Sequence, residues 1–227
     1  MKITVLTENT ACRESLACEH GLSLYIETGC HKILFDAGQS GAFADNAEAL
    51  GIDLSSVDFA VLSHGHYDHS GGLIRFLECN HTAPIYLTAE ALEPHYHDER
   101  YIGVDPALFS SPRLRFVQEN TFLFPGITLR RDLTLLRPID DGGLSKEELG
   151  IKKAEDFRHE QYLLIEEDDR RILFSGCSHK GILDITEWFH PDILIGGFHF
   201  SKLPTDDRLA EYAAILDSYP TQYITCH

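Results

Sequence analysis

The chain has 227 residues, of which 43% are hydrophobic, and its formal net charge at pH 7 is −17. This length and apolar content suit one sizeable α/β domain or two small ones, and no segment has the composition of a disordered region. The negative charge argues against a nucleic-acid partner or an anionic membrane, because both bind a basic face. It leaves room for an anionic small-molecule substrate, since bound metal ions can reverse the charge locally.

No apolar run approaches the length of a membrane span. Residues 2–7 alternate as a strand does and lack the apolar core of a signal peptide. The cysteines are scattered, with no C-x-x-C pair, which favours reduced thiols and a cytoplasmic location. They are Cys12, Cys18, Cys30, Cys79, Cys177 and Cys226.

The first half of the chain predicts strands that alternate with short helices. Strands are expected at residues 2–7, 21–27, 32–36, 57–62 and 84–88, and helices at 42–50 and 73–78. Residues 95–111 have no clear period, so we expect an irregular functional loop there. His95 and His97 fall in that loop and are each expected at the surface rather than as metal ligands.

A dense group of metal-capable side chains follows the strand at 57–62. The pattern is H-x-H-x-D-H and comprises His64, His66, Asp68 and His69. Side chains at every second position of an extended chain project to one side, and the glycines that follow permit the turn that His69 needs. Imidazoles with one carboxylate suit zinc, iron or manganese better than calcium or magnesium. The motif therefore predicts a metal site.

The second half predicts a further set of strands and helices. Strands are expected at residues 122–124, 127–136, 162–165, 171–174, 192–199 and 222–227, and helices at 182–189 and 205–219. Residues 140–143 are expected as a turn, and the charged segment 146–157 as helix-tolerant.

Metal-capable residues recur where these strands end. They are Asp36, His64, Cys177 with His179, His199 and His227. Such residues at successive strand ends, with helices between the strands, predict a layered α/β domain with its site along one rim. For Asp36, a side chain that points into the site and an Asx-turn acceptor remain equal alternatives.

These motifs resemble the metallo-β-lactamase fold superfamily. Beyond H-x-H-x-D-H, the segments 34–40, 176–182 and 196–199 are similar to the branch named for 7,8-dihydropterin-6-methyl-4-(β-D-ribofuranosyl)-aminobenzene-5'-phosphate synthase. The resemblance implies a four-layer αββα sandwich that holds one or two divalent metal ions. It also implies a single domain over residues 1–227, with two pseudo-equivalent halves that meet near residue 115.

The same resemblance implies a set of ligands. His64 and His66 would bind a first ion, and Asp68, His69 and His227 a second. His179 is the favoured bridging ligand and Cys177 the alternative. The superfamily's usual third motif is absent, so that His159, Glu160 or neither would complete the first site.

The implied activity is that of a metal-dependent hydrolase, which uses a metal-bound hydroxide on a small anionic or phosphorylated substrate. Zinc is the expected ion, with iron or manganese as alternatives. Asp68 would orient the hydroxide, and His199 would act as general acid or substrate contact, with His20 and Asn9 as weaker candidates. The alternatives are a dihydropterin diphosphate transferase, in which metals stabilise the leaving diphosphate, and a non-hydrolytic metal or redox protein.

Overall fold

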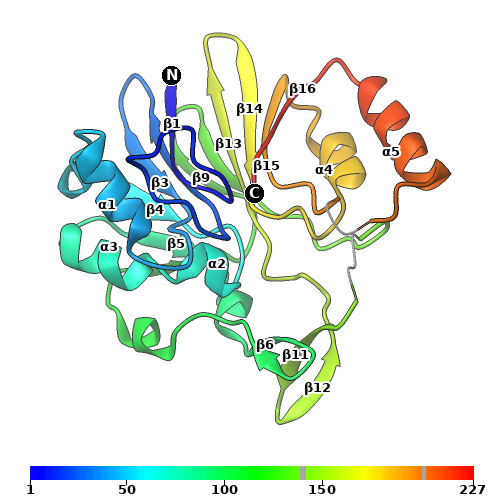
Figure 1. Cartoon of the computed structure of the whole chain (residues 1–227), viewed down its shortest axis with the longest axis horizontal. Coiled ribbons are helices and arrows are strands. Elements are labelled where there is room, and N and C mark those ends of the chain that lie inside the picture. The colour runs from blue at the N-terminus through cyan, green and yellow to red at the C-terminus, as the bar shows by residue number, and fades with distance from the viewer. Residues whose placement is uncertain (139–141, 201–202) are drawn as a thin grey trace.

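The computed structural model describes residues 1–138, 142–200 and 203–227. Within these residues, two six-stranded sheets and a smaller four-stranded sheet account for the strands. The first large sheet lies to the left in Figure 1 and the second in the centre and to the right. The four-stranded sheet lies apart, at the bottom of the picture.

The first large sheet is built from the first half of the chain. Its strands β1, β2 and β3 pair antiparallel, and β3, β4, β5 and β8 pair parallel. In spatial order they are β1 (Lys2–Thr7), β2 (Ser23–Glu27), β3 (Lys32–Phe35), β4 (Phe59–Val61), β5 (Ile85–Leu87) and β8 (Leu114–Phe116).

The second large sheet is built from the second half. Strands β9, β10, β13 and β14 pair antiparallel, and β14, β15 and β16 pair parallel. From one edge to the other they are β16 (Gln222–Thr225), β15 (Ile193–Gly196), β14 (Arg170–Ser175), β13 (Tyr162–Glu167), β10 (Ile127–Arg130) and β9 (Thr121–Phe124).

The two large sheets pack face to face. Alternate residues of both sheets form one buried cluster, in which the rings of Phe35 and Phe174 lie 5.8 Å apart. The outer face of the first sheet is covered by α1 (Ala42–Ala49) and α3 (Leu73–Cys79), and that of the second by α4 (Ile182–Phe189) and α5 (Asp207–Asp217). Because each sheet buries apolar side chains on both faces, the arrangement is the expected four-layer αββα sandwich.

The short helical turns that the structure describes lie in the first half of the chain. The single-turn helix α2 (Tyr67–Ser70) falls within the H-x-H-x-D-H motif. The 3₁₀ turns are η1 (Leu54–Ser56), η2 (Ala89–Leu92) and η3 (Pro106–Ser110). Among the described residues, none of the helices is long and apolar enough to cross a membrane.

The small sheet, called the accessory sheet below, corrects two expectations. It comprises β6 (His95–His97), β7 (Arg100–Tyr101), β11 (Leu144–Glu148) and β12 (Ile151–Ala154). Residues 95–111 are therefore partly regular, with two strands and one 3₁₀ turn. The segment 146–157, which was expected to tolerate a helix, contributes to strands β11 and β12 instead.

A turn explains why 146–157 forms strands. Leu149 and Gly150 both have positive φ, and Glu148 pairs with Ile151 across them. A two-residue turn with positive φ at both positions matches the twist of a β-hairpin, whereas an α-helix requires negative φ. The turn expected at 140–143 lies partly outside the described residues.

Candidate metal centre

The H-x-H-x-D-H motif begins just after β4. His66 is extended, with φ −98° and ψ 148°, and it caps α2. The alternation expected from the sequence therefore applies to His64 and His66, whereas Asp68 and His69 lie in the first turn of a helix. This corner folds tightly, because a side chain at Gly65 would come within 2.4 Å of the Ala91 carbonyl oxygen.

The structure brings the metal-capable side chains together in adjacent groups, each with ligand atoms within 4.8 Å of one another. The first group comprises His64, His66 and His179. The second comprises Asp68, His69, Cys177 and His227, and Cys177 also lies with His179 and His199. Of the two alternatives for a bridging ligand, His179 belongs to the first group and Cys177 to the second, and their ligand atoms also lie within 4.8 Å of each other.

The residues of the first group fit a metal ion. Nε2 of His64, Nε2 of His66 and both ring nitrogens of His179 are buried without a hydrogen-bond partner. Leaving such atoms unpaired costs about 1–3 kcal/mol each, a cost that an ion would remove. Burial, reinforced by nearby imidazoles, holds the pKa of all three rings below the usual value. They are therefore neutral at pH 7 and present lone pairs to a cation.

The second group is held by Asp36. The buried Asp36 Oδ2 lies 2.7 Å from His69 Nδ1, and Asp36 Oδ1 accepts the Ser63 N–H at 2.7 Å. A carboxylate behind a histidine fixes the ring and turns the other nitrogen toward a metal. His69 Nε2 accordingly lies 3.1 Å from Cys177 Sγ. Asp36 therefore points into the site, which settles the alternative of a simple turn acceptor.

Charge at the second group also suits a cation. Burial opposes ionisation of the Cys177 thiol, but His69 and His64 outweigh it and hold the pKa of Cys177 well below its usual value. Burial likewise opposes charge on His69, whereas Cys177, Asp36 and Asp68 raise its pKa well above the usual value. The protonated ring thus compensates a thiolate and carboxylates, and a metal ion could replace that proton. Thiolate and imidazole ligands together are typical of zinc and iron.

His227 and His20 lie at the mouth of this group. Nε2 of His227 is 3.3 Å from Asp68 Oδ2, and Nε2 of His20 is 3.4 Å from the same oxygen. Burial alone would lower the pKa of His227. The hydrogen bond to Asp68 and the Cys177 thiolate have the larger effect and raise this pKa to about 9. Asn9 Oδ1 lies 3.0 Å from His227 Nδ1, so both weaker sequence candidates, His20 and Asn9, border the site.

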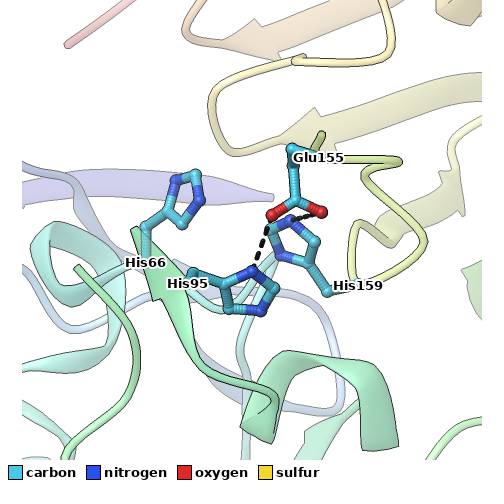
Figure 2. A group of neighbouring side chains, drawn as sticks. All are labelled: His66, His95, Glu155 and His159. Carbon is cyan, nitrogen blue, oxygen red and sulfur yellow. Dashed lines mark hydrogen bonds and ion pairs between the residues drawn. The ribbon is translucent and has the colours of Figure 1, made fainter. Parts of the chain in front are cut away.

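A further buried group adjoins His66 and comprises His95, Glu155 and His159 (Figure 2). His95 Nδ1 lies 2.7 Å from Glu155 Oε2, and His159 Nε2 lies 3.6 Å from Glu155 Oε1. His95 is fully buried, so its expected surface position is wrong, because β6 pairs with β11 and turns the ring inward. Glu155 had no sequence signal, since it lies 60 residues from His95.

The surroundings of His159 determine which of its ring nitrogens carries the proton. His159 Nδ1 accepts the Gly65 N–H at 2.9 Å, and burial, with His95, keeps the pKa of His159 well below its usual value. A neutral ring that accepts at Nδ1 carries its proton on Nε2. His159 in this tautomer supports the backbone between His64 and His66, and its Nε2 is buried without a hydrogen-bond partner in a group that could also hold a metal ion.

Glu160 has a different environment. Its Oε2 accepts the Lys180 N–H at 3.0 Å, and burial raises its pKa to about 7. Glu160 belongs to none of the metal-capable groups among the described residues.

The first and second groups open onto a cavity of about 190 Å³, through His66 and His179 of the first and Asp68, Cys177 and His227 of the second. His199 lies on its wall, with its ring 4.5 Å from that of His179. The cavity is lined by Asn9, His20, His66, Tyr67, Asp68, His97, Arg100, Ile102, Leu144, Cys177, His179, Gly197, His199 and His227.

Comparison with known proteins agrees with this architecture. The family profile of the metallo-beta-lactamase superfamily matches residues 17–217. An uncharacterized protein of Methanocaldococcus jannaschii is 30% identical over 229 residues, which cover 92% of this chain and 84% of that protein. The 7,8-dihydropterin-6-methyl-4-(beta-D-ribofuranosyl)-aminobenzene-5'-phosphate synthase of the same organism is 28% identical over 227 residues, 88% of this chain and 77% of the synthase.

A solved structure is similar over nearly the whole chain. Tm1679, a metal-dependent hydrolase of the beta-lactamase superfamily, superposes with a TM-score of 0.84 at 30% identity and covers 99% of this chain and 87% of its own. The family profile, the sequence relatives and the shared fold lead to one conclusion: the chain belongs to the metallo-β-lactamase superfamily.

Proposed function

We propose that this chain is a metal-dependent hydrolase that acts on a small anionic substrate and binds zinc in preference to iron or manganese. One observation carries the proposal. Two adjacent groups of buried imidazole, carboxylate and thiol side chains open onto the same cavity. The free state of all six cysteines supports a reducing, cytoplasmic location.

The first group would hold one ion through His64, His66 and His179, and the second group another through Asp68, His69, Cys177 and His227. When bound, divalent ions supply Lewis acidity and a water acidic enough to attack at neutral pH. The protein's own residues would orient that water and transfer protons to and from it.

Asp68 would accept a hydrogen bond from the attacking water and so orient it. Asp36 and Ser63 keep the ligand rings in place, since Asp36 bonds His69 and Ser63 Oγ lies 2.8 Å from His64 Nδ1. His199, beside His179 on the cavity wall, would donate a proton to the leaving-group atom.

The test combines elemental analysis with hydrolysis of a panel of phosphate and carboxylate esters. We expect His64→Ala and Asp68→Asn to lose bound metal and turnover together, whereas His81→Ala, at an exposed position, retains both. Unchanged metal content and turnover in His64→Ala would refute the proposed function.

A transferase is the second candidate, because the synthase relative matches 88% of this chain. Turnover of a dihydropterin diphosphate with and without an aryl-amine ribose phosphate separates the two activities. Product that forms only with the amine would favour transfer, and release of diphosphate without it would favour hydrolysis.

A further inference from the structure

The accessory sheet forms one wall of the cavity. His97, Arg100, Ile102 and Leu144 all come from this sheet or the residue that follows β7, and all line the cavity. The wall is tied to the metal motif by the Tyr67 N–H, which donates to the Ile102 carbonyl at 2.7 Å. The position of this wall relative to the metal-capable groups is therefore fixed by backbone contacts.

Arg100 is the cationic side chain of that wall. Its guanidinium carbon lies 4.8 Å from the centre of the Tyr67 ring, and Tyr67 stands between His66 and Asp68 in sequence. Among the residues that line the cavity, Arg100 is the one lysine or arginine. Cation–π contact with Tyr67 restricts where the guanidinium can go without consuming its hydrogen-bond donors.

The charge of Arg100 is not neutralised within the described part of the chain. No carboxylate there forms an ion pair with it, although neighbouring cations of the accessory sheet are paired. Lys152 lies 2.7 Å from Glu99, and Lys146 lies 2.9 Å from Asp156 and 3.1 Å from Glu93. Arg100 is exposed, so water solvates its charge and an anion that enters the cavity can reach its donors.

We propose that Arg100, with His97 beside it on the wall, is a subsite for an oxyanion of the substrate, a carboxylate or a phosphate separate from the group that reacts. Guanidinium presents paired N–H donors whose spacing matches the oxygens of either anion. Ile102 and Leu144 supply apolar surface on the same wall, so the substrate would also carry an apolar part. This inference rests on the proposed function only in assigning the cavity to substrate.

The test measures binding of inorganic phosphate and of acetate to the zinc-loaded protein by calorimetry. We expect Arg100→Ala to weaken the preferred anion about tenfold, consistent with loss of one charge-assisted contact. Arg100→Lys should recover part of the loss, because it restores charge without the paired donors. The anion whose affinity falls more in Arg100→Ala identifies the substrate group that the subsite binds, a carboxylate or a phosphate.

Lys152→Ala is the matched control, since it removes one positive charge from the same sheet at a residue that does not line the cavity. Equal weakening in Lys152→Ala and Arg100→Ala, or no weakening in Arg100→Ala, would overturn the subsite. The zinc content of each variant must equal that of the parent protein, so that the loss is assigned to the side chain.

The outcomes also separate this inference from the proposed function. If no ester is hydrolysed but Arg100→Ala still weakens anion binding, the subsite stands and the hydrolase proposal falls. If hydrolysis needs metal but Arg100→Ala leaves anion binding and KM for anionic esters unchanged, the subsite falls alone.

Discussion

The Gly65 N–H donates to Nδ1 of His159 across 94 residues of sequence, at 2.9 Å. Gly65 lies between two metal-capable histidines, so this bond fixes the backbone that carries both. His159 is held in turn by Glu155, whose other carboxylate oxygen meets His95 (Figure 2). Support of this kind typically changes metal affinity about 10–100-fold when it is removed.

We therefore expect His159→Ala to weaken metal binding at the first group by about tenfold or more. Competition with a chromophoric chelator would measure the affinity, and His81→Ala is the control. Unchanged affinity would refute the supporting role. A third metal equivalent in the parent protein that disappears in His95→Ala would show instead that the group around Glu155 binds metal itself.

Cys177 provides a spectroscopic prediction. Because its sulfur lies 3.1 Å from His69 Nε2 in the second group, cobalt-substituted protein should show thiolate-to-metal charge transfer in the near ultraviolet. Cys177→Ser should lose this absorbance, whereas Cys18→Ser, at an exposed thiol, should retain it. Absorbance that persists in Cys177→Ser would exclude the thiolate as a ligand.

Metal removal should lower stability. An ion at a hundred times its Kd stabilises the folded state by about 2.7 kcal/mol per site, which corresponds to roughly 5–10 °C in Tm for a chain of this size. Thermal unfolding with and without a chelator measures the difference, and His64→Ala should respond less than the parent. If the chelator strips the ions and Tm does not fall, ions and folding are not coupled.

Glu160 gives a pH dependence. Burial raises its pKa from the usual 4.5 to about 7, so the folded state holds a proton that the unfolded state releases between these values. The free energy of unfolding should therefore fall by about 3 kcal/mol as pH rises from 4.5 to 7 and then level off.

Glu160→Gln removes this titration and should be more stable than the parent above pH 7, by about the same amount. Urea unfolding of the metal-free proteins from pH 5 to 8.5 measures the difference, with the exposed Glu119→Gln as control. A constant difference between Glu160→Gln and the parent over this range would contradict the assignment.

Much of the fold follows from local sequence. Apolar alternation predicted most strands of the two large sheets, and H-x-H-x-D-H located the metal motif because its residues are neighbours. The hairpin at 144–154 was missed because its charged strands resemble an exposed helix. The feature that distinguishes it from a helix is the turn at Leu149 and Gly150, across which the two strands pair.

The ligand groups were harder to predict, because they depend on backbone geometry and on distant contacts. Ser178 has a φ of 58°, and this turn sends Cys177 toward the second group and His179 toward the first, although they are two residues apart. No sequence pattern relates Glu155 to His95. Their contact exists because β6, from the first half of the chain, pairs with β11, from the second half.

That pairing makes the accessory sheet a joint product of both halves. His97 from the first half and Leu144 from the second are register partners, and both line the cavity. Exchanging one hairpin alone would break the pairing, whereas exchanging both would replace the wall and would have to retain His95, whose ring meets Glu155 behind the metal motif. This wall of the cavity therefore depends on two hairpins that must be exchanged together, with His95 retained behind the metal motif.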